Sequence, residues 1–235
     1  MHPDLIKLLD LQAKDAAIAE VDARVAAVDG EASGLDQELE RARSARDAAQ
    51  RAAADGARRR DELETKIESY RQLQERRRQR LEFVRNPKEA STMMAEMDLA
   101  RSVLAKEESD WVRSADTVET LQARVSEEQG KMEGVEAQQT PRRDGLAAQR
   151  ALLVSEREDL VAEREAAASQ LDRALRIRYD RLRRARATPV VVPLNGDACG
   201  ACFTAIPRNR RSQIRAGAVL EGCEACGVIL YAVGS

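Results

Sequence analysis

The sequence is poor in aromatic residues and in histidine. Its 235 residues include two Phe, three Tyr and one Trp, so aromatic residues make up 3% of the chain. Cores of globular proteins depend strongly on aromatic burial, so this shortage argues against one compact globule. The one histidine, His2, lies at the N-terminus, which disfavours acid–base catalysis by histidine. Phosphate-binding glycine loops and common hydrolase motifs are missing too. We therefore expect no enzymatic activity and no small-molecule substrate.

Long apolar runs are also missing. No stretch of 18 apolar residues occurs, so we expect no membrane-spanning helix and no membrane partner. The N-terminal residues lack a basic region followed by an apolar one, so no signal peptide is predicted. The four cysteines all lie after residue 195, in two close pairs. Together these features predict a cytoplasmic protein whose cysteines stay reduced and hold a metal.

Charged residues are abundant, at 34% of the chain, and apolar residues recur among them every seven positions. Such a repeat is typical of a left-handed coiled coil. The first series, with its polar interruptions, runs to Leu81 and Val84. The second is broken only by Gln139. The first series contains Val21, Val28, Leu35, Ala42, Ala49, Gly56, Leu63 and Tyr70, and the second contains Met97, Leu104, Trp111, Val118, Val125, Met132, Gln139, Leu146, Leu153, Leu160, Ala167 and Ala174.

The two series are separated by a turn signal. Asn86 is a good helix N-cap, Pro87 suits the first helical position and Glu89 completes a capping-box-like pattern. The sequence therefore predicts a mainly α protein: a long antiparallel coiled-coil hairpin with a small C-terminal β zinc ribbon. We expect the hairpin domain over 1–187, with helix 1 at about 4–84, the turn at about 85–87 and helix 2 at about 88–187, and the ribbon domain over 188–235.

A hairpin centred on Asn86 has two further consequences. Pro141 would face Glu31, between Gly30 and Gly34, and these helix-disfavouring residues indicate either a bend or tolerated sequence drift. Helix 2 would also extend past helix 1 as a neck with an apolar stripe. The stripe needs cover from the C-terminal domain, the N-terminal residues or a second subunit, and consists of Leu171, Leu175, Tyr179 and Leu182.

The cysteine spacing gives the most specific motif. Cys199-Gly-Ala-Cys202 is followed after twenty residues by Cys223-Glu-Ala-Cys226-Gly227. Two CxxC pairs at such spacing are typical of one structural Zn²⁺ held by all four cysteines. Four thiolates close the tetrahedron, so no coordination position is left for a reacting water. Two disulfides or a redox CxxC are the alternatives, which the cytoplasmic context and the doubled spacing disfavour.

Charge is segregated although the net charge is only −2. Residues 15–40 are strongly acidic, whereas the hairpin turn, the neck and the ribbon are rich in arginine. We interpret the arginines at the turn as solvated helix formers. Those of the neck and ribbon are candidates for binding nucleic acid or an acidic partner. The candidates are Arg176, Arg178, Arg181, Arg183, Arg184, Arg208, Arg210 and Arg211. The ribbon's two aromatic residues, Phe203 and Tyr231, are expected to pack in its core, which disfavours base stacking.

The chain resembles the bacterial C4-type zinc-ribbon family over its whole length. The resemblance rests on Cys199-Gly-Ala-Cys202-Phe203, on Cys223-Glu-Ala-Cys226-Gly-Val-Ile-Leu-Tyr231 and on Val84-Arg-Asn86-Pro-Lys88-Glu89. Val228 and Ala90 depart from the family pattern, which often has an arginine and an aromatic residue there. The resemblance implies a cytoplasmic, non-enzymatic zinc protein of a kind usually described as nucleic-acid-binding or as a regulatory adaptor.

Two functions stay open at this point. In the first, the ribbon and the basic neck bind the backbone of RNA or DNA, with a strong dependence on salt. In the second, the protein is a protein–protein adaptor or chaperone-like factor that uses its coiled coil, with the transcription machinery as one candidate partner. The sequence does not specify the oligomeric state.

Overall fold

The computed structural model describes residues 2–185, 189–217 and 220–233. Two long helices, α1 (Pro3–Leu81) and α2 (Pro87–Ser169), are followed by the short helix α3 (Arg173–Ala185). The C-terminal part contains β1 (Val191–Asn195), β2 (Ala198–Cys199), α4 (Arg208–Ala216) and β3 (Ile229–Tyr231). Within the described ranges, no helix combines the length and the apolar character that crossing a membrane requires.

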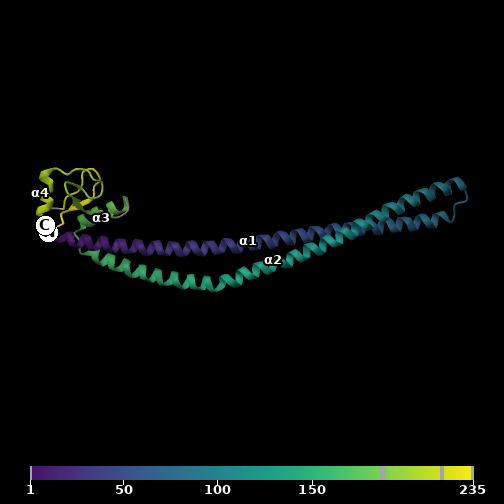
Figure 1. Ribbon diagram of the computed structural model, residues 1–235, viewed down its shortest axis with the longest axis horizontal. Helices are drawn as coiled ribbons and strands as arrows, with labels where there is room; N and C mark the ends of the chain where they lie inside the picture. Colours follow the sequence, from purple (N-terminus) through teal and green to yellow (C-terminus); the bar gives the residue numbers. More distant parts are fainter. Residues whose placement is uncertain (1, 186–188, 218–219, 234–235) are drawn as a thin grey trace. The chain divides into compact units, whose positions relative to one another are not determined.

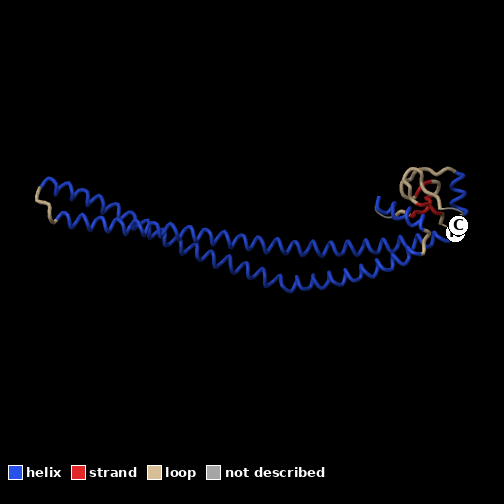
Figure 2. The backbone as a smooth tube through the Cα atoms, turned by 180° about the vertical axis from the view of Figure 1, so that it is seen from behind, coloured by secondary structure: helices blue, strands red, loops and turns tan. Residues whose placement is uncertain are grey.

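The chain forms two compact units. The first contains Met1–Ala32 and Asp144–Ser235, and the second contains Ser33–Arg143. In each unit α1 and α2 run antiparallel, as Figure 1 shows. The first unit also holds α3 and the strands, which Figure 2 marks in red. The division into a hairpin over 1–187 and a ribbon over 188–235 stays a prediction, because its boundary falls on residues 186–188, outside the described residues.

The predicted coiled-coil seam is confirmed by burial. Val21, Val28, Leu146 and Leu153 are buried, as the seven-residue repeat requires. The polar Gln139 is buried as well, and its side-chain amide donates to Glu38 Oε2 at 2.9 Å. Because this amide has a partner, the polar residue fits the seam without an unsatisfied group.

A ladder of ion pairs connects the two long helices. Four aspartates at seven-residue intervals on α1 face four arginines at the same interval on α2. These pairs are Asp15–Arg164, Asp22–Arg157, Asp29–Arg150 and Asp36–Arg143, with N···O distances of 2.5–3.2 Å. Four of the eight acidic residues between 15 and 40 are therefore paired with arginines of the facing helix.

The ladder corrects the predicted register. Pro141 lies between Gln139 and Arg143, which contact Glu38 and Asp36, so its level on α1 is not that of Glu31. Side chains lean toward the N-terminus of their own helix. In an antiparallel pair, a residue of α2 therefore contacts a residue of α1 other than the one found by counting equal numbers of residues from the turn. Gly30, Gly34 and Pro141 do not share one level, and a bend of the hairpin stays a prediction.

The predicted end of the second helix is wrong. Instead of continuing to about residue 187, α2 ends at Ser169 and α3 begins at Arg173. The side chain of Asp172 accepts hydrogen bonds from the amides of Ala174 (2.8 Å) and Leu175 (3.4 Å), so it caps α3. An N-cap aspartate stabilises a new helix start, and the apolar spacing on either side of it concealed the break. At the turn, by contrast, the predicted cap is confirmed, since Asn86 Oδ1 accepts from the Lys88 amide at 3.0 Å.

The strands form one small sheet in the order β2-β1-β3. β1 pairs antiparallel with β2 and parallel with β3, with Val192 opposite Leu230. One face of this module encloses a small core of Val192, Ile206, Ile214, Val228 and Leu230, which also contains Cys199 and Cys223. The sheet and α4 thus place the cysteines at the edge of an apolar core.

Candidate metal centre and basic neck

The four cysteines lie on two similar turns. In the first, the amide of Phe203 donates to the carbonyl of Cys199 at 3.0 Å, and in the second the amide of Gly227 donates to that of Cys223 at 2.7 Å. Both Phe203 and Gly227 follow the second cysteine of their pair, and both have a left-handed backbone, with φ of 58° and 79°. Each turn therefore presents its two thiols in the same way.

The sulfur geometry fits a four-coordinate metal. All four Sγ atoms lie within 4.8 Å of one another. The Cys199–Cys226 and Cys202–Cys223 Sγ pairs are 3.8 and 3.6 Å apart. A tetrahedral ion with metal–sulfur bonds of about 2.3 Å requires sulfur–sulfur distances of about 3.8 Å, whereas a disulfide is about 2.05 Å long. All four cysteines are free thiols in this structure, so the arrangement suits a metal and not two disulfides.

The surroundings of the sulfurs favour a thiolate at one position above all. The hydroxyl and the backbone amide of Thr204 lower the pKa of Cys202 to about 6, and the hydroxyl oxygen lies 3.3 Å from Sγ. Burial raises the pKa of Cys199. The amide of Ala201 lies 3.4 Å from Cys199 Sγ and points at it, as expected in a turn that supports a metal-bound sulfur.

The ribbon is packed onto the base of the hairpin through one continuous core. Leu8 and Leu11 of α1, Tyr179 of α3, and Val190 and Ile229 of the ribbon belong to this cluster. Leu171, Leu175 and Leu182 also contribute to it. The predicted need for cover over the neck is therefore met by two of the three expected elements, the N-terminal residues and the C-terminal domain.

Polar contacts fix the same junction. The side-chain oxygen of Gln12 accepts hydrogen bonds from the amides of Val190 and Val191, both at 2.8 Å, and its amide donates to the carbonyl of Val191 at 3.0 Å. The second knuckle faces α3, because a Cβ at Gly227 would lie 3.3 Å from Leu182 Cδ2. Arg178 of α3 donates to the carbonyl of Leu220 at 3.1 Å.

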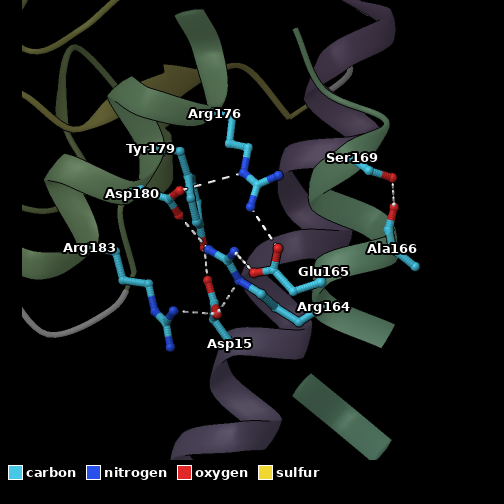
Figure 3. Close-up of polar contacts among 9 residues, drawn as sticks. All are labelled: Asp15, Arg164, Glu165, Ala166, Ser169, Arg176, Tyr179, Asp180 and Arg183. Atoms are coloured by element: carbon cyan, nitrogen blue, oxygen red, sulfur yellow. Dashed lines mark hydrogen bonds and ion pairs between the residues drawn. The ribbon is translucent and has the colours of Figure 1, made fainter. Parts of the chain in front are cut away.

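A buried polar cluster joins α1, α2 and α3, as Figure 3 shows. The side chain of Asp15 is fully buried and accepts from Tyr179 at 2.8 Å, and its carboxylate pairs with Arg164 at 3.2 Å and Arg183 at 2.9 Å. Burial, with the hydrogen bond to Asp15, raises the pKa of Tyr179 above its usual range. The phenol therefore stays protonated and remains a donor.

The structure uses most of the predicted basic residues internally. Arg176 pairs with Glu165, Arg183 with Asp15, Arg210 with Glu221 and Glu224, and Arg211 with Asp197, while Arg178 donates to a backbone carbonyl. Arg181, Arg184 and Arg208 are exposed and have no hydrogen-bond or ion-pair partner among the described residues. The eight arginines thus do not form one continuous basic surface.

Sequence reasoning missed several residues of this region. Gln12 and Asp15 belong to α1. The heptad pattern there predicts packing against α2, but it does not predict contacts with the C-terminal part. Phe203 was expected in the ribbon core and is instead 69% exposed. The available signal was its position directly after the second cysteine of the pair, where the other turn has Gly227, because a glycine there shows that the turn does not need a side chain in the core.

Comparisons with known proteins support the architecture. No protein-family model and no curated protein sequence matches the chain. Among solved structures, CT398 from Chlamydia trachomatis is similar with a TM-score of 0.88 at 17% identity, over 97% of both chains. A protein from Mycobacterium smegmatis has a TM-score of 0.69 at 24% identity, over 99% of this chain and 100% of that one. The HP0958 protein from Helicobacter pylori has a TM-score of 0.53 at 14% identity, over 96% and 98%. These likenesses confirm the predicted fold class, a helical hairpin with a small C-terminal sheet.

Proposed function

We propose that the protein is a non-enzymatic, zinc-stabilised adaptor that binds other proteins, and that it belongs with the C4-type zinc-ribbon proteins it resembles. One observation supports the proposal above all: the sheet of the four-cysteine module packs onto the base of the hairpin, where Val190 and Ile229 share a core with Leu8 of α1. A metal held there fixes a folded head on two long helices. Its four thiolate ligands leave no open coordination position, so the ion has a structural role.

Zn²⁺ is the ion that best suits this donor set. Four cysteine sulfurs at tetrahedral spacing are typical of structural zinc sites. The module is too small to fold through burial alone, so the metal supplies folding free energy. Because the ligands must be reduced, the site fits a reducing compartment such as the cytoplasm.

Protein binding is favoured over nucleic-acid binding by the state of the arginines. Five of the eight candidates are engaged within the molecule. Releasing them to phosphates would sacrifice internal contacts, including one to the buried Asp15. A surface of paired charges also attracts a polyanion less strongly than free arginines do.

Nucleic-acid binding remains the second candidate, and a specific observation favours it. Arg181 and Arg184 of α3 and Arg208 of α4 are exposed and unpaired within the described ranges, and they leave three cations for phosphates. The resulting surface differs from the predicted one, because it lacks the five internally engaged arginines.

A salt series separates the two functions. The zinc-loaded full chain is titrated with labelled single-stranded RNA, single-stranded DNA and duplex DNA, and anisotropy is measured from low to high salt. The adaptor proposal expects weak binding at all salt concentrations. Tight binding with a steep salt slope, lost in the R181A/R184A variant, would contradict it and establish the nucleic-acid function.

A further inference from the structure

The hairpin tip, defined here as residues 68–117, has a dense run of cations around its turn. Residues 71–88 contain seven basic and two acidic residues. Arg71 and Arg78 have carboxylate partners. The other five, Arg76, Arg77, Arg80, Arg85 and Lys88, have none among the described residues. Nearer the base, a carboxylate on α1 faces each ladder arginine of α2. Residues 71–88 therefore carry a net charge of +5, within a tip whose ten basic and ten acidic residues balance overall.

The tip is also packed more loosely than the seam elsewhere. Every residue of the tip is described, and none is buried between Ile67 on α1 and Val118 on α2. Leu81, Val84, Met93 and Met97 are only half-buried. In a two-helix seam such half-buried apolar side chains stay accessible from the side, where a further helix can pack against them.

Apolar side chains project from the same segment. Phe83 is 82% exposed, directly beyond the end of α1, and Met94 and Leu99 are exposed on α2. Three of the five methionines of the chain, Met93, Met94 and Met97, lie within five residues. Methionine adapts its shape to a partner and is frequent at surfaces that receive amphipathic helices.

We propose that the hairpin tip binds an acidic amphipathic helix of a protein partner. The apolar face of that helix would cover Phe83 and the methionine cluster, and its carboxylates would pair with Arg76, Arg80, Arg85 and Lys88. Such a helix-in-groove mode uses apolar anchors with a complementary charged rim. The inference rests on the protein-binding proposal above and names the surface and the chemistry of the partner.

The composition of the tip favours a helix over the other anionic partners. Single-stranded nucleic acid is usually bound on aromatic stacking platforms, and the apolar residues here are mainly Leu, Val and Met. A membrane surface reaches protruding residues such as Phe83, but the half-buried Leu81 and Met97 lie along the seam between α1 and α2. A narrow element such as a helix is needed to cover them.

Three labelled peptides test the proposal with the zinc-loaded full chain. The first is a Leu/Glu amphipathic helix, the second has the same residues in scrambled order, and the third replaces Glu with Lys. We expect the amphipathic acidic peptide to bind more tightly than the other two, and its affinity to fall with salt. F83A and R80E/R85E should each weaken it about tenfold or more. L152A, at a residue of α2 that is also exposed (74%), is the matched control and should bind as wild type.

Several outcomes would overturn the proposal. Equal affinity for the scrambled peptide, or unchanged affinity in F83A, excludes a helix-binding tip. Displacement of the peptide by phosphatidylserine vesicles or by single-stranded RNA, in a manner that depends on Phe83, would assign the surface to a membrane or to RNA. The C199S variant separates this inference from the zinc proposal, because a chain that loses its ribbon should still bind the peptide through the tip.

Discussion

Gly227 and Phe203 occupy the same position of the two cysteine turns but have different surroundings. Both need a left-handed backbone, which costs a residue with a side chain about 1 kcal/mol. Gly227 has Leu182 against it, and a Cβ there would come within 3.3 Å of Leu182 Cδ2. Phe203 lies on the turn that faces solvent, where a large side chain has room. The close contact with α3, and not the geometry of the cysteine turn, is therefore the reason that position 227 requires glycine.

This contrast predicts the effect of Gly227→Ala. The variant should destabilise the ribbon by about 2 kcal/mol, because left-handed strain adds to the contact with Leu182. Gly196→Ala is the matched control. It has a φ of 60° and nothing within 4 Å of its Cβ, so its cost should be about 1 kcal/mol. Urea midpoints of zinc release measure both, and equal costs would contradict a tight contact between the knuckle and α3.

Asp15 should be the most sensitive residue of the polar cluster. Asp15→Asn leaves Arg164 and Arg183 without their shared buried carboxylate, and we expect a loss of about 3 kcal/mol in the free energy of unfolding. Asp22→Asn breaks a pair of the same ladder whose side chains are both exposed by nearly half, so its cost should be below about 1 kcal/mol. Calorimetry of both variants tests the difference, and a small cost for Asp15→Asn would show that the cluster contributes little to stability.

At the scale of elements, the sequence predicted the periodic parts and missed the break. The seven-residue repeat predicted the seam, and Asn86-Pro87 predicted the start of α2, because both signals are local. The break at Asp172 was missed because Leu171 and Leu175 keep helical spacing across it. The contacts of Asp15 and Gln12 were missed because they depend on where α3 and β1 pack. Spacing identified the four cysteines, whereas the pairing of Arg176 and Arg183 required the tertiary structure.

The two helix caps predict effects confined to one unit each. Asp172→Ala should cost about 1 kcal/mol in the first unit, and Asn86→Ala should cost about the same in the second. The single tryptophan, Trp111, lies in the second unit and reports on its unfolding, while zinc release reports on the first. Asp172→Ala should shift only the zinc midpoint, and Asn86→Ala only the fluorescence midpoint. A shift of both midpoints in either variant would mean that the two units unfold together.

In the whole molecule, the helical content should be independent of the folding of the ribbon. α1 and α2 comprise 79 and 83 residues, and their seam does not involve the cysteines. Removing the metal with a chelator should therefore leave the far-ultraviolet helical signal near that of the untreated protein. The amide protons of β1 and β3 should lose protection from hydrogen exchange, because the sheet loses the site that holds its turns together. Unchanged protection after chelation would show that the ribbon folds without metal.

The proposed function depends first on four cysteines that hold one structural zinc ion. Its most direct test is the metal content of the purified full chain by plasma mass spectrometry, compared with that of Cys199→Ser. We expect one zinc per chain in the native protein and a loss of zinc in the variant, with helicity near that of the wild type. A native chain without zinc, or a Cys199→Ser chain that retains a full equivalent, would contradict it.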